Sequence, residues 1–237
     1  KRGVTAIVDA GLAPGIPNFL LGYHDVKGEI DSFEYYVGGL PKNPKPPFNY
    51  KAPFSPVDVI EEYIRPARMK VNGKRITRSA VSEIENINFE NVGTLEAFNT
   101  DGLRSILVTM DHINNMKEKT LRYPGHAALM ANYRNAGKFD KERIRKTSDE
   151  LFRAWRLEKN EPELTIMKII IKIERSKIEY NLYDEFDVKT GFSSMSRTTG
   201  FTATATVNMV ALNLFNECGV FPPELVGKKL NCTEYLI

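Results

Sequence analysis

The stretch from Thr120 to His126 places side chains with useful chemistry around a short break in the chain, Pro124-Gly125. Strand alternation would put Thr120 and Arg122 on one face and Leu121 on the other. An arginine beside a threonine at a strand end suits a carboxylate, through a bidentate fork and a hydroxyl donor. His126 would then begin a helix, where the dipole keeps an imidazole neutral. A strand arginine paired with an internal acid, and a histidine that caps a helix, would give the same pattern, so both interpretations stay open.

A second candidate site follows the short apolar run from Val4 to Val8, which is typical of a buried strand. Gly11, Pro14 and Gly15 then interrupt the chain, and a helix is expected over 16–26. Such a strand–turn–helix exposes backbone N–H groups at a helix N-terminus, where a ligand can approach them. A tight turn that needs glycine only for its dihedral angles would look the same.

Other motifs that carry chemistry are absent from the sequence. It has no G-x-G-x-x-G turn after a strand, no P-loop, no H-E-x-x-H and no nucleophile elbow. The histidines at 24, 112 and 126 lack metal-ligand spacing, so no metal site is expected. His24 and His112 lie in polar stretches and are expected at the surface. Cys218 and Cys232 are too few for a disulfide framework and are expected to be reduced thiols.

Size and composition indicate a globular protein with one large domain or two small ones. The chain has 237 residues, of which 42% are apolar and 27% charged. A formal net charge of +3 without a long basic run argues against nucleic-acid or membrane binding through bulk charge. No apolar run reaches the length of a membrane span and no secretory signal opens the sequence, so we expect a cytoplasmic protein.

The elements that must position these residues mix helices and strands. Helices are expected over 16–26, 56–64, 102–111, 127–135, 141–157 and 198–215, and strands over 4–8, 31–37, 67–71, 74–79, 81–89, 93–98, 119–123, 163–174 and 177–187. The Asn72-Gly73 dipeptide predicts a β-hairpin. Gly38-Gly39 is expected to end a strand, 42–53 to be a proline-rich loop and 219–224 a second loop. Antiparallel pairs that alternate with helices indicate an α+β fold with a mixed sheet.

The two ends of the sequence suggest a piece of a longer protein. A strand that is apolar on both faces begins almost at once after Lys1, although such a strand needs neighbours on both sides. The last residues, 225–237, look cut off before a natural end. We therefore expect further residues upstream and downstream.

Five stretches together carry a resemblance to a known family. They are Ala10-Gly11-Leu12-Ala13-Pro14-Gly15, Tyr36-Val37-Gly38-Gly39-Leu40-Pro41, Tyr50-Lys51-Ala52-Pro53-Phe54-Ser55-Pro56, Thr120 to His126, and Gly219-Val220-Phe221-Pro222-Pro223-Glu224. In this order and spacing the sequence resembles the saccharopine dehydrogenase family, most closely the branch that includes lysine 6-dehydrogenase. The resemblance implies an NAD(P)-dependent oxidoreductase that acts on the C–N bond of an amino acid, either lysine or a saccharopine-like substrate.

The resemblance also implies an architecture. The fold expected is α+β: a mixed, largely antiparallel sheet with helices on one side, like the C-terminal domain of glyceraldehyde-3-phosphate dehydrogenase, plus remnants of a Rossmann domain at both chain ends. Residues 1–15 would be the last strand and turn of that Rossmann domain, 16–197 a substrate-binding and dimerisation domain, and 198–237 the returning segment. The family implies a homodimer that binds NAD or NADP, with this chain alone inactive.

Roles carried over from the family fall on matching positions. Leu12, Ala13 and Pro14 would border the nicotinamide, and Ser55 would touch the cofactor. Thr120, Leu121 and Arg122 would bind the amino-acid substrate, with Arg122 on its carboxylate.

Three positions depart from saccharopine enzymes. Ala13 replaces an aspartate and Val37 a cysteine, and a second substrate arginine falls at Thr100 in a loosely aligned region. One arginine fewer favours a substrate with fewer carboxylates, such as lysine.

The residue that moves the proton is less defined. His126 is the first candidate for proton transfer or orientation, with Asp101 and Tyr123 as alternates. Two other functions fit the same resemblance: an imine-reducing synthase of polyamine precursors, of the carboxynorspermidine synthase type, and a non-catalytic dimerisation module. An upstream strand followed by G-x-G-x-x-G would favour an enzyme.

Overall fold

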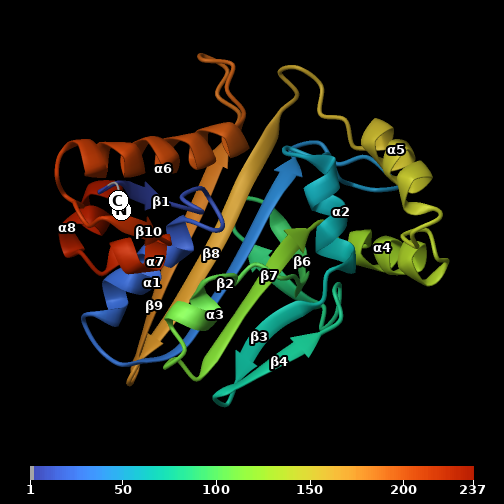
Figure 1. The fold of residues 1–237 in the computed structure, drawn as a ribbon. Helices are drawn as coiled ribbons and strands as arrows, with labels where there is room; N and C mark the ends of the chain where they lie inside the picture. The colour runs from blue at the N-terminus through green and yellow to red at the C-terminus, as the bar shows by residue number, and fades with distance from the viewer. Residues whose placement is uncertain (1–2) are drawn as a thin grey trace.

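The computed structural model describes residues 3–237 and shows an α+β fold built on one large mixed sheet (Figure 1). The strands are β1 (Thr5–Ile7), β2 (Ile30–Pro41), β3 (Ala67–Val71), β4 (Lys74–Arg78), β5 (Glu85–Phe89), β6 (Gly93–Asn99), β7 (Asn115–Arg122), β8 (Glu163–Ile173), β9 (Ser176–Glu185) and β10 (Gly219–Phe221). The helices are α1 (Ile16–Asp25), α2 (Pro56–Ile64), α3 (Ile106–Thr109), α4 (His126–Asn135), α5 (Ile144–Ala154), α6 (Ser194–Ala211), α7 (Pro223–Gly227) and α8 (Leu230–Leu236).

The large sheet has eight strands in the order β4-β3-β7-β2-β8-β9, with the β5-β6 hairpin added beside β7. Within it only β2 and β7 run parallel, and the other pairs are antiparallel. One edge of β7 therefore pairs with β3 near Met116 and with β6 from Lys119 to Arg122. This arrangement places β7 near the middle of the sheet, where backbone groups on both of its edges are hydrogen-bonded.

The two faces of the sheet are buried in different ways. On one face, Phe33, Met116 and Ile169 pack with Leu21 of α1 and Ile106 of α3 in the main hydrophobic core. On the opposite face, a smaller cluster is drawn from strands and strand ends, among them Tyr36, Leu95, Leu121 and Ile166. Helices cover the first face only, as expected from the resemblance.

The helices form two groups on that covered face (Figure 1). One group contains α1, α3, α6, α7 and α8, and the other contains α2, α4 and α5. The second group has its own core, in which Tyr63, Phe98 and Met130 pack around Trp155. The part of the sheet between the two groups is where polar side chains of β7 become accessible to a ligand.

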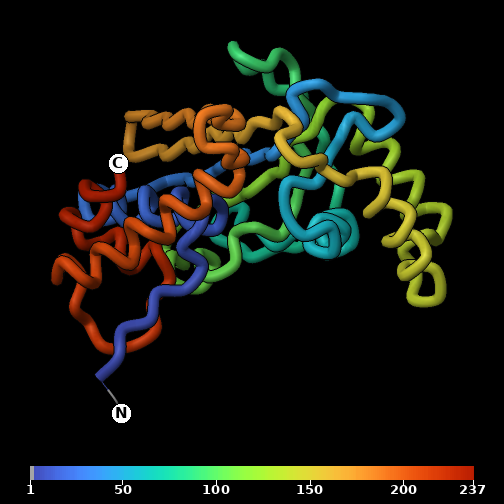
Figure 2. The backbone as a smooth tube through the Cα atoms, turned by 90° about the horizontal axis from the view of Figure 1, so that it is seen from above, coloured from blue at the N-terminus to red at the C-terminus, as the bar shows by residue number. Residues whose placement is uncertain are grey.

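Segments from near the two ends of the chain lie at the same side of the molecule (Figures 1 and 2). Strand β1 pairs in parallel with β10, from Thr5 with Gly219 to Ile7 with Phe221. The loop predicted over 219–224 is therefore wrong, because its first residues form β10 and Pro223 begins α7. A three-residue strand carries too weak a pattern to be recognised without the partner that it pairs with.

Further sequence predictions need correction. The helix expected over 102–111 is limited to α3, the strand expected over 81–89 is limited to β5, and the strand expected to be buried over 4–8 is partly exposed, with Val4 64% and Val8 43% exposed. Strand β2 continues through Gly38 and Gly39, because both residues pair with β8. Glycine is needed at Gly38 because a side chain there would lie 2.8 Å from the carbonyl oxygen of Leu121. Strand β7 begins at Asn115, four residues before the predicted start. His24 is buried at 7% exposure, with Nε2 2.8 Å from the Tyr180 hydroxyl, whereas His112 is exposed as expected.

None of the helices described between residues 3 and 237 is both long and apolar enough to cross a membrane. Cys218 and Cys232 are both free, as the sequence predicts.

Candidate functional site

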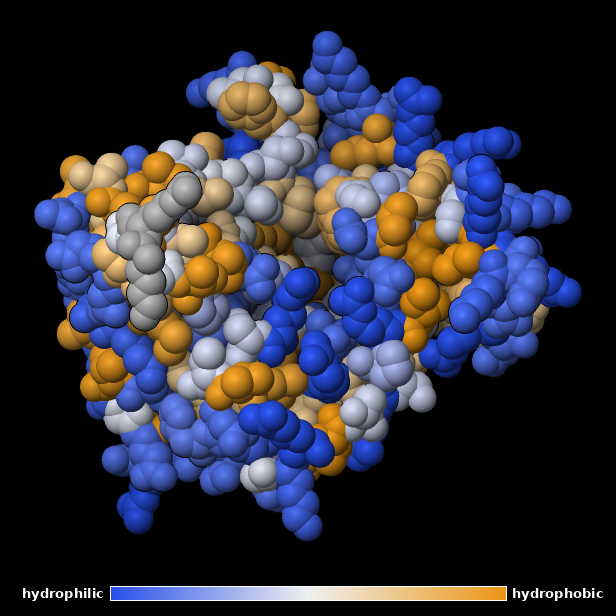
Figure 3. All heavy atoms as spheres, in the orientation of Figure 1, coloured by the Kyte–Doolittle hydropathy of each residue, from blue (hydrophilic) through white to orange (hydrophobic). Residues whose placement is uncertain are grey.

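Two adjoining cavities open on the covered face of the sheet, between the two helix groups. A hollow is visible near the middle of this face (Figure 3). The inner cavity, of about 230 Å³, is lined by Ala13, Pro14, Tyr35, Val37, Phe54, Asp58, Glu61, Glu62, Arg65, Thr100, Asp101, Gly102, Arg104, Glu118 and Thr120. The turn cavity, of about 430 Å³, is lined by Asp9, Ala10, Gly11, Leu12, Ala13, Pro14, Val37, Gly38, Gly39, Phe54, Glu62, Thr120, Arg122, Met195 and Thr199. They share six lining residues, so one ligand can extend across both.

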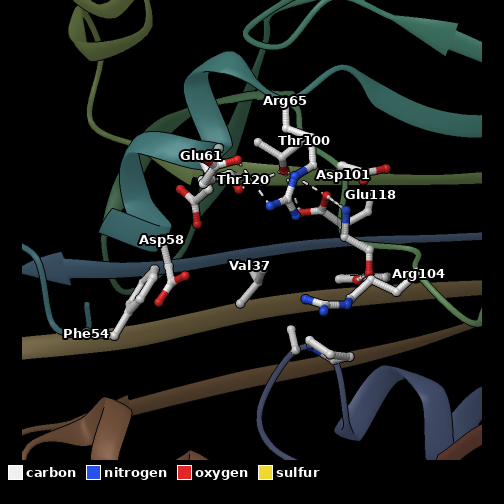
Figure 4. Close-up of a pocket in the computed structure, with 15 residues that line it drawn as sticks. Val37, Phe54, Asp58, Glu61, Arg65, Thr100, Asp101, Arg104, Glu118 and Thr120 are labelled. Atoms are coloured by element: carbon white, nitrogen blue, oxygen red, sulfur yellow. Dashed lines mark hydrogen bonds and ion pairs between the residues drawn. The ribbon is translucent and has the colours of Figure 1, made fainter. Parts of the chain in front are cut away.

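Strand β7 supplies a polar row to the floor of these cavities (Figure 4). Glu118, Thr120 and Arg122 alternate along the strand and face the same side, as the sequence predicts for Thr120 and Arg122. The Leu121 side chain lies in the cluster on the opposite face of the sheet. The structure therefore brings Thr120 and Arg122 to the cavities and leaves the Leu121 side chain outside them.

Arg122 is 2% exposed and has several partners within the protein. Its Nη2 donates to Glu62 at 2.6 Å, its Nη1 to the carbonyl of Leu121 at 2.9 Å, and its guanidinium lies 4.3 Å from the centre of the Tyr50 ring. Nε also lies 3.4 Å from the Tyr63 hydroxyl. A guanidinium has five N–H donors, so two remain for a ligand. Arg122 therefore has the internal acid partner that the structural interpretation expects. It also lines the turn cavity, and carboxylate binding there stays a prediction.

Glu118 is a buried acid that the sequence analysis missed. It lines the inner cavity and is 4% exposed. Thr100 Oγ1 lies 2.8 and 2.7 Å from its two carboxyl oxygens, and the backbone N–H of Gly102 donates to Oε2 at 2.9 Å. Burial raises the pKa of Glu118 to about 8, although the bonds from Thr100 and Gly102 oppose this shift. Glu118 is therefore protonated at neutral pH and can exchange a proton near it.

His126 begins α4 as predicted, but the structure does not bring it to either cavity. Its Nδ1 donates to the carbonyl of Phe48 at 2.7 Å, so its Nε2 accepts from the Tyr63 hydroxyl at 2.8 Å. Burial, followed by the charge of Arg122, lowers the pKa of His126 to about 3. The ring is thus neutral and supports Tyr63 and the proline-rich loop.

The remaining proton-transfer candidates lie in different surroundings. Asp101 lines the inner cavity, but both of its oxygens accept from the guanidinium of Arg68, each at 2.8 Å. Tyr123 lies outside both linings and donates to the carbonyl of Pro41 at 3.0 Å. Ser55, the residue before α2, is exposed and also lies outside both linings, whereas the neighbouring Phe54 lines both cavities.

The turn after β1 borders both cavities. Leu12, Ala13 and Pro14 line the turn cavity, and Ala13 and Pro14 also line the inner cavity. Gly15 has φ +146°, and an added side chain would lie 1.7 Å from the carbonyl oxygen of Gly11. Only glycine therefore fits this position.

Hydrogen bonds that lead to the buried carboxyl group of Glu224 stabilise the turn. The N–H of Gly15 donates to Asn18 Oδ1, and Asn18 Nδ2 in turn donates to Glu224 at 2.8 Å. The other oxygen of Glu224 accepts from Thr109 of α3 at 2.6 Å. Glu224 therefore ties the turn to α1, α3 and α7, and the chain end contributes to the shape of the site.

Charged residues of both signs surround the mouth of the inner cavity (Figure 4). Asp58, Glu61 and Glu62 come from α2, and Arg65 and Arg104 lie beside them in the lining. The spacing of 58, 61, 62 and 65 places these residues on one helix face, which is a signal that the sequence contains. Such a mixed lining suits a zwitterion, which carries both an ammonium and a carboxylate.

The turn cavity fits the nicotinamide end of a dinucleotide. It is bordered by Leu12, Pro14 and Met195, and Gly38 and Gly39 leave its wall without side chains, which suits a flat ring. Leu12, Ala13 and Pro14 would hold that ring. Among residues 3–237, no group of three or more His, Cys, Asp or Glu side chains is arranged to hold a metal ion.

A protein-family model matches this chain. The family model of the saccharopine dehydrogenase C-terminal domain matches residues 11–236, nearly the whole chain. The chain belongs to this family. Saccharopine dehydrogenase-type C-terminal domains are parts of amino-acid oxidoreductases.

Curated relatives match over a shorter region. The chain is 31% identical over 157 residues to alpha-aminoadipic semialdehyde synthase of Arabidopsis thaliana, which covers 60% of this chain and 15% of that protein. It is 26% identical over 153 residues to the mitochondrial alpha-aminoadipic semialdehyde synthase of Rattus norvegicus, covering 59% and 16%. The match thus spans only about a sixth of the length of these relatives.

A solved structure shares the fold. Saccharopine dehydrogenase (L-Glu forming) from Saccharomyces cerevisiae matches with a TM-score of 0.74 and 17% identity, over 97% of this chain and 71% of that one. The α+β fold with a mixed sheet, expected from the resemblance, is therefore confirmed.

Proposed function

We propose that this chain is the substrate-binding part of an NAD(P)-dependent oxidoreductase that acts on the C–N bond of an amino acid, either lysine or a saccharopine-like substrate. The observation that carries the proposal is the polar row of β7 at the floor of two joined cavities, beside a side-chain-poor turn. Family membership supports a reaction of this class. When bound, the oxidised nicotinamide would accept a hydride from the carbon that bears the amine.

The chain's own residues would bind and orient the substrate. Arg122 would offer its two remaining donors to the substrate carboxylate, next to the Thr120 hydroxyl. Asp58 and Glu61 at the mouth of the inner cavity would attract a substrate that carries an ammonium group as it enters. Phe54 and Pro14, which line both cavities, would exclude water around the reacting carbon.

The arginines that line the cavities bear on how many carboxylates the substrate carries. Thr100, where the second family arginine was expected, is occupied by its bonds to Glu118 and Thr120, which favours lysine. Arg65 and Arg104 nevertheless line the same cavity and could hold further carboxylates, which favours a saccharopine-like molecule. Measuring reduction of NAD⁺ and NADP⁺ by the full-length protein with lysine, saccharopine and related diamines distinguishes these substrates, and no reduction with any of them would contradict the proposal.

Arg122→Lys tests the carboxylate site. A lysine keeps the positive charge beside Glu62 but loses the planar fork, so the KM for the amino acid should rise roughly 10- to 100-fold. Binding of NAD(P) should be nearly unchanged, because the substitution leaves Leu12, Ala13 and Pro14, which would border the nicotinamide, as they are. Arg156→Lys serves as the control, since Arg156 is 74% exposed and lies outside both linings. An unchanged KM would remove Arg122 from the site.

The alternative function is an imine-reducing synthase, which would run the reaction in the opposite direction. It would consume NADPH with an aldehyde and a diamine, and the same cavities would hold the imine. Comparing NADPH consumption with this pair against NAD(P)⁺ reduction by amino acids separates the two functions.

We also propose that the protein is a homodimer through the helix-free face of the sheet. That face presents Tyr183, which is 37% exposed, beside charged residues such as Lys117 and Lys168. Sedimentation equilibrium of the full-length protein should give twice the mass of one protomer. A monomer at micromolar concentration would contradict this proposal.

A further inference from the structure

We propose that Glu118 is a proton store for the substrate's amino group, and that it exchanges protons with the cavity through the hydroxyls of Thr100 and Thr120. This inference rests on the proposed function, because it needs a ligand that carries an amino group. Glu118 acts through two other side chains, so it is a positioning residue for the proton rather than a catalytic residue.

The first step is a continuous chain of hydrogen bonds. Thr120 Oγ1 lies 2.8 Å from Thr100 Oγ1, and Thr100 Oγ1 lies 2.7 Å from Glu118 Oε2. Thr100, Glu118 and Thr120 are each 4% exposed. Thr120 lines both cavities, so the chain of bonds runs from the place where the two cavities join to the buried carboxyl group.

The second step is the direction of these bonds. When Glu118 is ionised it can only accept, so Thr100 donates to it and Thr120 donates to Thr100. Thr120 then has lone pairs available to accept a proton from the cavity. When Glu118 is protonated it donates to Thr100, Thr100 donates to Thr120, and the Thr120 hydrogen is free to point into the cavity. Protonation of Glu118 thus changes Thr120 from a hydrogen-bond acceptor for the ligand into a hydrogen-bond donor.

The transfer itself balances as a proton shift. The N–H bond of a ligand ammonium breaks as Thr120 Oγ1 accepts the proton; Thr120 gives its own hydrogen to Thr100, and Thr100 gives its hydrogen to Glu118. The net result is a neutral amine in the cavity and a new O–H bond on Glu118. The step involves neither oxidation nor reduction. A neutral amine is the form that can lose a hydride from its carbon, so this step prepares the substrate.

The surroundings place the proton affinity of Glu118 in a useful range. Glu62 of α2 and Asp101 of the preceding loop face it and, after burial, raise its pKa, which is about 8. Tyr35 of β2 and Arg104 of the same loop also line this cavity, and Arg122 lies on the same strand. A group with this pKa is protonated at neutral pH and readily ionised above it, as proton exchange requires.

Glu118→Gln separates proton storage from structural support. The amide oxygen can accept from the N–H of Gly102, and the amide nitrogen can donate to Thr100, so the local bonds are kept. The amide cannot take up a proton in this pH range. The matched control is Glu96→Gln, since Glu96 is another buried glutamate of the sheet, 6% exposed, which accepts from the N–H of Gly125 outside both cavities.

Infrared spectroscopy of the full-length protein provides a test without turnover. Between about pH 6 and pH 10, the carbonyl band of a protonated carboxylic acid should disappear with a midpoint near pH 8. The component of the band with this midpoint should be missing in Glu118→Gln and kept in Glu96→Gln. In Thr100→Val the midpoint should move to higher pH, because the Thr100 bond lowers the pKa of Glu118. A band that does not titrate, or that persists in Glu118→Gln, overturns the inference.

Kinetics test the relay. The kcat for amino-acid oxidation should rise with pH around pH 8 in the natural enzyme, and Glu118→Gln should lose this limb and roughly tenfold or more of kcat with little change in KM. Glu118→Asp should restore part of the limb, and Thr100→Val should lower kcat although Glu118 still titrates. An unchanged pH profile in Glu118→Gln, or an unchanged kcat in Thr100→Val, overturns the inference. Absence of turnover beside a titrating carboxyl contradicts the proposed function alone.

Discussion

His126 is neutral because it is buried, and its two partners decide where its proton lies. The sequence suggested the right charge state for a different reason, the dipole of α4. In the structure, burial comes first, and the positive charge of Arg122 adds to it. Sequence alone could not separate these causes, because Phe48 and Tyr63, which bond the ring, are distant along the chain.

Acid sensitivity follows from this histidine. Its folded-state pKa of about 3 lies below the ordinary value of 6.5, so between these values the unfolded chain binds a proton that the folded protein does not. The free energy of unfolding should therefore fall as the pH is lowered from 6.5 towards 3, by at most about 1.4 kcal/mol per pH unit from this residue. Urea unfolding of the natural protein and of His126→Gln, measured across that range, checks the prediction. Equal slopes in the two proteins would contradict it.

Glu118 shows why part of the site escaped the sequence analysis. The alternation that identified Thr120 and Arg122 extends two residues further back, to Glu118. That extension went unrecognised because the preceding residues, Asn115 and Lys117, are polar and weak strand formers. They are held extended by hydrogen bonds to β2, which the local pattern does not contain.

At the scale of elements, local patterns identified most helices and hairpins correctly. The β3-β4 hairpin forms around Asn72-Gly73 as predicted, and α2 begins at Pro56 after Ser55. The wrong predictions lie where contacts with other elements, rather than the local sequence, determine the structure. Gly38 lies within β2 because it pairs with Ile166 of β8, and β10 forms because it pairs with β1.

The packing of α1 on α7 gives a test with an internal control. A side chain at Gly22 of α1 would lie 2.0 Å from the carbonyl oxygen of Glu224, so Gly22→Ala should destabilise the protein by roughly 1–3 kcal/mol. Gly200 of α6 has no atom within 4 Å of an added side chain, so Gly200→Ala should stabilise it by up to about 1 kcal/mol. Thermal unfolding of both variants checks the pair. Destabilisation of similar size in both would contradict this packing.

A change in the packing of α1 on α7 should also alter the shape of the candidate site. Glu224 accepts bonds from Asn18 and Thr109, and Asn18 accepts from the N–H of Gly15 in the turn. Because the turn borders both cavities, a shift of α7 changes the shape of the surface expected to meet the nicotinamide. The end of the described chain is thus part of the site although it lies more than two hundred residues from the turn in sequence.

At the scale of the whole molecule, the two faces of the sheet differ in what covers them. Its covered face carries the cavities between two helix groups, and its other face is left to strands and charged side chains. The fold as a whole is shared with saccharopine dehydrogenase of Saccharomyces cerevisiae. The sequence motifs predicted this architecture through resemblance, but the joining of the cavities depends on how α2 and the turn approach each other in space (Figure 4).

The measurement that tests the central claim most directly is isotope transfer. The full-length protein is incubated with oxidised nicotinamide cofactor and with lysine or saccharopine deuterated at the carbons that bear nitrogen. If the cavities hold an amino acid for oxidation at its C–N bond, mass spectrometry will find a deuterium atom in the reduced nicotinamide. Reduced cofactor without deuterium, or no reduced cofactor with either substrate, would contradict the account.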